Sequence, residues 1–217
     1  MHYRRLGKSG LKVSEISLGS WVTFGSQLDD KEASRLIHTA YDNGVNFFDN
    51  ADVYADGQAE IVMGNAIKDL PREALVISSK VFWPTMPGPN GRGLSRKHIT
   101  ESVHASLRRL EIEYLDLYFC HRFDPDTPVD EVVFTMNHLI QQGKILYWGT
   151  SEWSAAQISQ ACGVARQFNL IPPTMEQPQY NMFHRERFAV RLQDRYRNSG
   201  LTSCSFQPSR LCHPPGH

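Results

Sequence analysis

The regular alternation of apolar runs and amphipathic segments is the feature that most constrains the fold of this chain. Nearly continuous apolar runs of strand length lie at Glu15–Gly19, Val45–Asp49, Ala74–Val81, Tyr114–His121, Ile145–Ser151 and Thr174–Gln177. Runs with so little polar alternation are typical of parallel strands that are covered on both faces. Segments with helical spacing fall between them, so a strand–helix unit recurs about every 30 residues. Before the first unit, Tyr3–Glu15 predicts a short antiparallel hairpin around a Lys-Ser-Gly turn.

The helical segments carry start and stop signals. Ser95 and Thr127 are expected N-caps, Ser154 begins a capping-box pattern, and Gly44 is expected to end the first helix. The apolar stripes comprise Ala33, Leu36, Ile37, Ala40 and Tyr41; Ile99, Val103, Leu107 and Leu110; Val132, Met136, Leu139 and Ile140; and Ile158, Ala161, Ala165 and Phe168. A last helix is expected over 184–197.

Two α/β folds fit this repeat: a (β/α)₈ barrel of the TIM type and an open, doubly wound sheet. A doubly wound nucleotide-binding fold carries G-x-G-x-x-G at its first strand–helix turn, and the sequence there, LGSWVTFGSQ, does not match. The stretch Gly7–Ser9 also fails as a phosphate loop, because His2 occupies the position of the required upstream glycine. The barrel is therefore favoured.

Composition argues against several classes of protein. The 23 basic and 23 acidic residues balance, so no general attraction to nucleic acid is implied. No apolar run reaches the ~20 residues that span a bilayer, and the first ten residues lack the apolar core of a signal peptide. The four cysteines show neither a disulfide framework nor zinc-ligand spacing. We expect a reduced, cytoplasmic protein with no metal site and no membrane insertion.

Polar or ionisable side chains lie where successive apolar runs end. Asp49, Lys80 and His121 end the second, third and fourth runs. In a barrel these C-terminal strand ends meet at one mouth, where catalytic residues gather. Other polar or aromatic residues at such ends are Trp21, Gln27, Ser151 and Gln177. Each has an ordinary structural explanation by itself, but their coincidence at successive strand ends favours a site.

These side chains, with Tyr54, suit the reduction of a carbonyl group. Free tyrosine has a pKa near 10, and the ammonium of Lys80 is expected to lower the pKa of Tyr54. Asp49 can hold Lys80 in place, and His121 can bond to the substrate oxygen as negative charge develops there. A cofactor would then deliver the hydride and tyrosine the proton.

The stretches FFDNADVY, VISSKVFW, YLDLYFCHRFDPDTP, YWGTSEWS and MEQPQYNMF resemble the aldo-keto reductases, over about Tyr3–Gly200. GSWVTFGSQ, RGLSRKHI, YWGTSEWS, ARQFNLIPP and EQPQYNMFHRE are similar to the branch that contains voltage-gated potassium-channel β-subunits. The resemblance implies an NADPH-dependent reductase of aldehydes or ketones on a (β/α)₈ barrel, with a small-molecule carbonyl substrate.

By position in these stretches, the resemblance assigns a catalytic tetrad to Asp49, Tyr54, Lys80 and His121, with Tyr54 as proton donor. Residues that it places along the cofactor are Ser20, Trp21, Gln27, Asp49, Ser151 and Gln177. Trp21 and Trp83 are expected to wall the substrate pocket, or else to be plain aromatic core.

Three departures from the family pattern leave alternatives open. Channel β-subunits carry asparagine where this chain has His121, which favours catalysis over regulation, and Glu152 replaces an arginine of that branch. After Thr202 the sequence SCSFQPSRLCHPPGH leaves the pattern. We expect an incomplete barrel over residues 1–202, with six units and the last one or two missing, then a disordered tail over 203–217. The alternatives to a reductase are a redox-sensing regulatory subunit of the channel β-subunit type, and a nonfunctional fragment that binds NADPH poorly. The expected macromolecular partners are copies of the chain itself or a channel's cytoplasmic domain.

Overall fold

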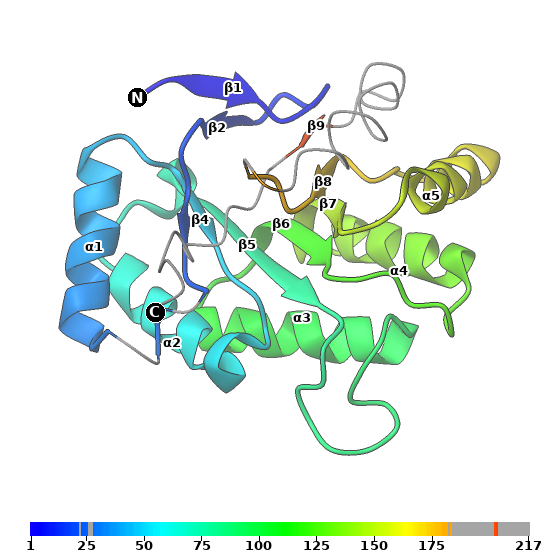
Figure 1. Cartoon of the computed structure of the whole chain (residues 1–217), viewed down its shortest axis with the longest axis horizontal. Coiled ribbons are helices and arrows are strands. Elements are labelled where there is room, and N and C mark those ends of the chain that lie inside the picture. The colour runs from blue at the N-terminus through cyan, green and yellow to red at the C-terminus, as the bar shows by residue number, and fades with distance from the viewer. Residues whose placement is uncertain (22, 26–27, 182, 184–201, 204–217) are drawn as a thin grey trace, which may run out of the picture.

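A computed structural model describes residues 1–21, 23–25, 28–181, 183 and 202–203 (Figure 1). Strands β1 (Tyr3–Arg5) and β2 (Lys12–Ser14) pair antiparallel and form the expected hairpin. A parallel sheet follows, in which each strand pairs with the next one along the chain. Its strands are β3 (Leu18–Gly19), β4 (Phe47–Asp49), β5 (Val76–Val81), β6 (Leu115–Cys120), β7 (Ile145–Ser151), β8 (Met175–Gln177) and β9 (Thr202–Ser203).

This sequential order separates the two folds that the sequence allowed. A doubly wound sheet reverses its strand order at a switch point, whereas here the order β3 to β9 never reverses. The strands curl into an incomplete (β/α)₈-type barrel, with the helices on its outer face (Figure 1). The two-residue strand β9 adds a seventh member beside β8. The expected helix over 184–197 and all of the expected tail except Ser203 lie outside the described residues.

The helices that cover the sheet are α1 (Asp30–Asp42), α2 (Gln58–Ile67), α3 (Arg96–Leu110), α4 (Val129–Gln141) and α5 (Ala155–Gln167), with 3₁₀ turns η1 (Tyr54–Gly57) and η2 (Arg72–Ala74). The sequence did not predict α2. Seven of its ten residues are buried, so it has no polar face from which an amphipathic pattern could be recognised. At Gly64 an added Cβ would lie 2.7 Å from the Leu110 carbonyl oxygen of α3, which shows how closely the two helices pack.

The helix termini follow most of the signals in the sequence. Ser95 accepts a hydrogen bond from the backbone of the next turn, and Ser154 forms a complete capping box. Thr127 as an N-cap is wrong: Pro128 takes that position, and the Thr127 hydroxyl donates to Asp124 instead. The threonine side chain therefore stabilises the preceding loop, and no side chain caps this helix terminus.

The apolar stripes are confirmed except at two positions. Leu36 and Phe168 are 40% and 48% exposed. Phe168 lies beyond the last turn of α5 and contacts Phe134 of α4, with ring centroids 5.1 Å apart. Both residues lie at the edge of their stripe, where a side chain faces water as readily as the sheet.

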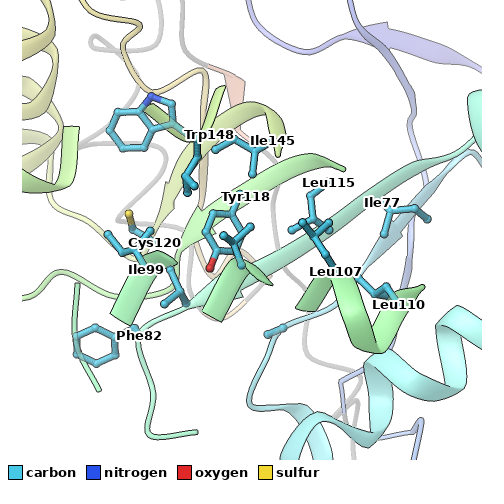
Figure 2. Close-up of a cluster of buried hydrophobic side chains, with 14 of the residues drawn as sticks. Ile77, Phe82, Ile99, Leu107, Leu110, Leu115, Tyr118, Cys120, Ile145 and Trp148 are labelled. Carbon is cyan, nitrogen blue, oxygen red and sulfur yellow. The ribbon is translucent and has the colours of Figure 1, made fainter. Parts of the chain in front are cut away.

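Two apolar clusters hold the barrel together. All residues of β5 and β6 are buried, as expected for parallel strands covered on both faces. The larger cluster lies between the sheet and the helices, and it includes Tyr118, Ile145 and Trp148 of the sheet together with Leu107 and Leu110 of α3 (Figure 2). The smaller cluster is formed by Leu6, Val13, Phe47, Val76, Leu117, Phe119 and Met175. It packs the hairpin against β4, β5, β6 and β8.

Neither a metal centre nor a membrane span emerges from the described residues. No cluster of three or more histidine, cysteine, aspartate or glutamate side chains there is arranged to hold a metal ion. Among the helices in this part of the chain, none combines the length and the apolarity needed to cross a bilayer.

Candidate active site

The ends of three neighbouring strands bring the expected site residues together. Asp49 ends β4, Lys80 lies one residue before the end of β5, and His121 directly follows β6. The parallel registers pair Asp49 with Ser78 and Lys80 with Phe119 near the end of β6, so these strand ends lie at one level. Tyr54 begins the turn η1 that follows β4. None of the four is more than 8% exposed.

The ammonium group of Lys80 is the centre of this cluster. Its Nζ atom donates to Asp49 Oδ2 at 2.7 Å, to the Asn50 carbonyl oxygen at 2.6 Å and to the Tyr54 hydroxyl at 3.2 Å. All three donors of the ammonium are therefore used. Burial by itself would lower the pKa of Lys80, but Asp49 and Tyr54 together outweigh burial and raise it. Lys80 consequently stays charged at neutral pH.

Asp49 connects the cluster to strand β8 on the opposite side of the curled sheet. Its Oδ1 atom accepts from Ser78 Oγ at 2.6 Å and from Gln177 Nε2 at 3.3 Å. Gln177 is 128 residues away in the sequence and lies on β8, so this bond spans the interior of the curled sheet. Ser151 Oγ donates to the Gln177 carbonyl oxygen at 2.9 Å, and Ser20 Oγ to the Asp49 carbonyl oxygen at 3.1 Å.

An unusual backbone turn positions Tyr54. The three residues that follow it, Ala55, Asp56 and Gly57, all have positive φ angles, of 49°, 53° and 88°. Only glycine adopts this region without a steric cost, so two of these residues are strained. The side chain of Arg109 packs over the turn, since a Cβ added at Gly57 would lie 2.9 Å from Arg109 Cδ. The turn leaves Tyr54 buried and within hydrogen-bond distance of Lys80.

The pKa of Tyr54 is raised, not lowered as the sequence led us to expect. Burial is the largest cause, and it outweighs the opposing charge of Lys80. The carboxylate of Asp49 adds to the rise, because it offsets the field of the ammonium at the phenol. Tyr54 therefore stays protonated across the neutral range, as a proton donor must.

His121 faces the Tyr54 ring and is uncharged. The two ring centroids are 5.9 Å apart at an angle of 79°. Burial, then the positive charges of Lys80 and Arg122, lower the pKa of His121 to about 2. Its Nδ1 atom is buried and has no hydrogen-bond partner in the described part of the chain. A neutral imidazole has one N–H to donate, which suits contact with a carbonyl oxygen.

Trp21 and Trp83 lie on two sides of this cluster. The Trp21 ring is 6.4 Å from that of Tyr54, and the Trp83 ring is 6.4 Å from that of His121. Trp21 is 38% exposed and Trp83 half-buried, so neither is plain aromatic core. Their role as pocket walls stays a prediction.

The other residues expected along the cofactor are only partly placed. Ser20, Ser151 and Gln177 join the network around Asp49, whereas Gln27 lies outside the described residues. Glu152, which departs from the family pattern, has a φ of 60° and accepts from the backbone N–H of Gln179.

Sequence reasoning missed Ser78, Asn50 and Arg122 in this site. Ser78 could have been found, because it precedes Lys80 by two residues in a strand and must face the same side of the sheet. Asn50 contributes a backbone carbonyl, for which side-chain type gives no signal. Arg122 follows His121 in the sequence, and its charge acts on both His121 and Tyr54.

Comparisons with known proteins agree with this geometry. A family model described as the aldo/keto reductase family matches residues 15–207. Two plant proteins, each described as a probable voltage-gated potassium channel subunit beta, are similar over 210 residues: one from Arabidopsis thaliana at 52% identity and one from Oryza sativa subsp. japonica at 50%. Each match covers 96% of this chain and 64% of the relative, so the chain spans less than two thirds of their length. A crystal structure of a thermostable aldo-keto reductase with the inhibitor epalrestat matches with a TM-score of 0.82 and 31% identity, over 94% of this chain and 71% of that one.

Proposed function

The chain belongs to the aldo/keto reductase family, and from this premise we propose that it reduces aldehydes or ketones to alcohols with NADPH, using Tyr54 as the proton donor. The family makes an oxidoreductase the expected class of activity. The observation that carries the finer proposal is the bonding of Lys80, which connects Asp49, the Asn50 carbonyl and the Tyr54 hydroxyl in one buried cluster.

The residues present fit a nicotinamide cofactor. Gln177 gives one N–H to Asp49, and its other N–H and its amide oxygen can bind the amide of a nicotinamide. Ser20 and Ser151 lie beside it in the same network, and the partly exposed ring of Trp21 offers an apolar wall. NADPH, when bound, supplies a hydride to the carbonyl carbon of the substrate.

The side chains then act on the carbonyl oxygen. Tyr54 and neutral His121 can donate hydrogen bonds to it, which stabilise the negative charge that develops in the transition state. Tyr54 transfers its proton to that oxygen, which completes the alcohol. Lys80 stabilises the phenolate left on Tyr54, because its ammonium already bonds the same oxygen atom. Asp49 keeps the ammonium in place and balances its charge inside the protein.

Replacing Tyr54 with phenylalanine tests this assignment. Tyr54→Phe keeps the ring but removes the proton donor, so we expect kcat for benzaldehyde reduction to fall by about 10²–10⁴-fold. The rate is measured as NADPH oxidation by absorbance, and circular dichroism checks that the variant is folded. Tyr41→Phe on α1, which lies away from the cluster, is the matched control and should keep its rate. A Tyr54→Phe protein as active as the wild type would refute Tyr54 as the acid.

Similarity to the two plant proteins supports a second candidate function, that of a regulatory subunit of a potassium channel. Both relatives carry that description, and their identity to this chain is 50% or more. The test is co-purification of this chain with the cytoplasmic domain of a plant voltage-gated potassium channel. Binding that persists in Tyr54→Phe would show that association with the channel does not require reduction.

A further inference from the structure

Two arginine side chains lie against Trp83 at the edge of the site. The Arg122 guanidinium carbon is 5.7 Å from the centre of the Trp83 ring, and that of Arg92 is 5.9 Å from it. Arg92 also lies 5.3 Å from the centre of the Phe82 ring. Both arginines are within cation–π range of the indole. The two come from different loops, Arg92 from the segment after β5 and Arg122 from the start of the segment after β6.

Arg122 has most of its hydrogen-bonding capacity left. Its Nη1 atom donates to the His121 carbonyl oxygen at 2.5 Å, which uses one of the five N–H groups of a guanidinium. No carboxylate of the described residues forms an ion pair with it. Arg72, Lys80 and Arg109 are also partly or fully buried, and each forms an ion pair with a buried carboxylate. Arg122 differs from these three, because its charge is not balanced by such a pair.

Arg92 has an acidic neighbour that is already engaged. The negative charge of Asp124 acts on Arg92, but the carboxylate oxygens of Asp124 accept from the Leu94 N–H at 2.7 Å, the Asp126 N–H at 3.1 Å and the Thr127 hydroxyl at 2.7 Å. The bond from the Leu94 N–H connects the two loops that carry the arginines. Burial would raise the pKa of Asp124, but the bonds from Thr127, Leu94 and Asp126 hold it below its usual value. Asp124 therefore helps to connect the two loops, and no ion pair of the described residues joins it to either arginine.

The arginines lie beyond the reacting groups along a line of rings. The Tyr54 ring contacts that of His121, and the His121 ring contacts that of Trp83, against which both guanidinium groups rest. A substrate whose carbonyl oxygen reaches Tyr54 and His121 would extend its remaining part along Trp83 towards Arg122. A flat or extended chain that ends in a carboxylate has the shape and charge for this path.

We propose that Arg122, assisted by Arg92 across the Trp83 ring, is a carboxylate-binding site that selects carbonyl substrates carrying a negatively charged group. The inference rests on the proposed function, since it names the substrate class of the same site. A guanidinium binds a carboxylate through two parallel hydrogen bonds, and these are about twice as strong as neutral ones. The half-buried position of Arg122 beside the Trp83 ring strengthens the attraction, because less water screens it.

A pair of matched aldehydes tests the proposal. 4-Carboxybenzaldehyde and 4-formylbenzamide have nearly the same shape, but only the first is charged at pH 7. We expect kcat/KM to be at least about tenfold higher for the carboxylate. In Arg122→Gln the ratio of the two kcat/KM values, carboxylate over amide, should fall to near one. In Arg92→Gln this ratio should fall by only about two- to threefold, because Arg92 is exposed and water screens its charge. Arg166→Gln on the exposed face of α5 is the control and should keep the wild-type ratio.

Binding provides a readout that does not depend on turnover. Quenching of tryptophan fluorescence by each aldehyde reports contact with Trp83, and Trp83→Phe identifies its share of the signal. If neither aldehyde is reduced but the carboxylate still binds more tightly than the amide in an Arg122-dependent manner, the reductase proposal fails and the anion site stands. If both are reduced equally well, with a ratio unchanged in Arg122→Gln, the anion site is overturned and the reductase proposal stands. Loss of NADPH affinity in Arg122→Gln without a change in the ratio would also overturn it, because the arginine would then serve the cofactor.

Discussion

Asp49 and Asp52 lie three residues apart and are almost equally buried, yet their surroundings differ. Asp49 is 5% exposed and faces the interior of the curled sheet, where it contacts Lys80, Ser78 and Gln177. Asp52 is 2% exposed and faces α3, where its Oδ2 atom accepts from Ser102 at 2.7 Å. Its Oδ1 atom has no hydrogen-bond partner among the described residues.

The difference shows that a buried carboxyl group needs a cation beside it in order to hold a catalytic side chain in place. Burial raises the pKa of Asp52 to about 7, with a smaller rise from the charge of Glu60, and the hydrogen bond from Ser102 opposes it. Within the described part of the chain Asp52 forms no ion pair, whereas Asp49 forms one with Lys80 at 2.7 Å. On the interior side of the sheet, Asp49 and Lys80 therefore form an ion pair that can take part in catalysis. On the helix side, the raised pKa of Asp52 means that this carboxyl group binds a proton more readily than an ordinary aspartate.

Removing the cation from the interior side should have the largest effect. Lys80→Met leaves Asp49 buried without its ion-pair partner, and such a loss costs about 3–5 kcal/mol in free energy of unfolding. It also removes the hydrogen bond that positions Tyr54, so we expect kcat to fall by at least about 100-fold. Urea unfolding and NADPH oxidation measure the two effects.

Arg72→Met is the matched control for Lys80→Met. Arg72 donates to Asp116 at 2.7 Å, and Asp116 lies in the first half of β6, away from the Tyr54 cluster. This variant also leaves a buried carboxylate unpaired, but it should keep kcat. If Arg72→Met lowered kcat as much as Lys80→Met, the rate loss would come from general destabilisation and not from the site.

The sequence predicted most of the site residues on the interior side of the sheet and few of the contacts on its helix side. Asp49, Lys80 and His121 were predictable because each follows an apolar run, and parallel strands in sequential order bring their ends together. The Asp52–Ser102 contact was not predictable, since it depends on how α3 packs against the loop after β4. The helix α2 was missed for a related reason, because burial on nearly all sides removes the polar face that marks a helix.

The sequence also predicted the wrong sign for the Tyr54 pKa shift, and the reason is physical. The sequence shows which charges are near, but not how much water is removed from around them. Burial turned out to be the largest cause of the shift, larger than the opposing charge of Lys80. Reduction should therefore persist through neutral pH, because the donor keeps its proton.

Asp52 should make stability depend on pH. Its folded-state pKa, about 7, is above the ordinary value of 3.8, so the folded chain holds a proton that the unfolded chain loses between these values. The stabilisation is fully present below about pH 4 and is lost as pH rises through 7, by up to about 4 kcal/mol. In Asp52→Asn the free energy of unfolding should change less between pH 4 and pH 8, as measured by urea unfolding at several pH values.

Asp42→Asn is the control for this pH series. Asp42 ends α1 and is exposed, so its replacement should leave the pH dependence as in the wild type. An Asp52→Asn protein whose stability falls with pH as steeply as the wild type would mean that another buried acid, such as Asp116, dominates the slope.

The smallest effect should come from two adjacent serines that point to opposite sides of β5. Ser78 donates to Asp49 at 2.6 Å on the interior side, and Ser79 donates to Glu60 at 2.6 Å on the helix side. Each alanine variant leaves a buried carboxylate oxygen with one bond fewer, which costs about 1–3 kcal/mol. Only Ser78→Ala should also lower kcat, by a few-fold, because Asp49 contacts Lys80 and Glu60 instead contacts Arg109. If the two variants have equal unfolding free energies but different kcat values, the interior side of β5 contributes to catalysis and its helix side to stability alone. Equal kcat values would show that Ser78 serves packing alone.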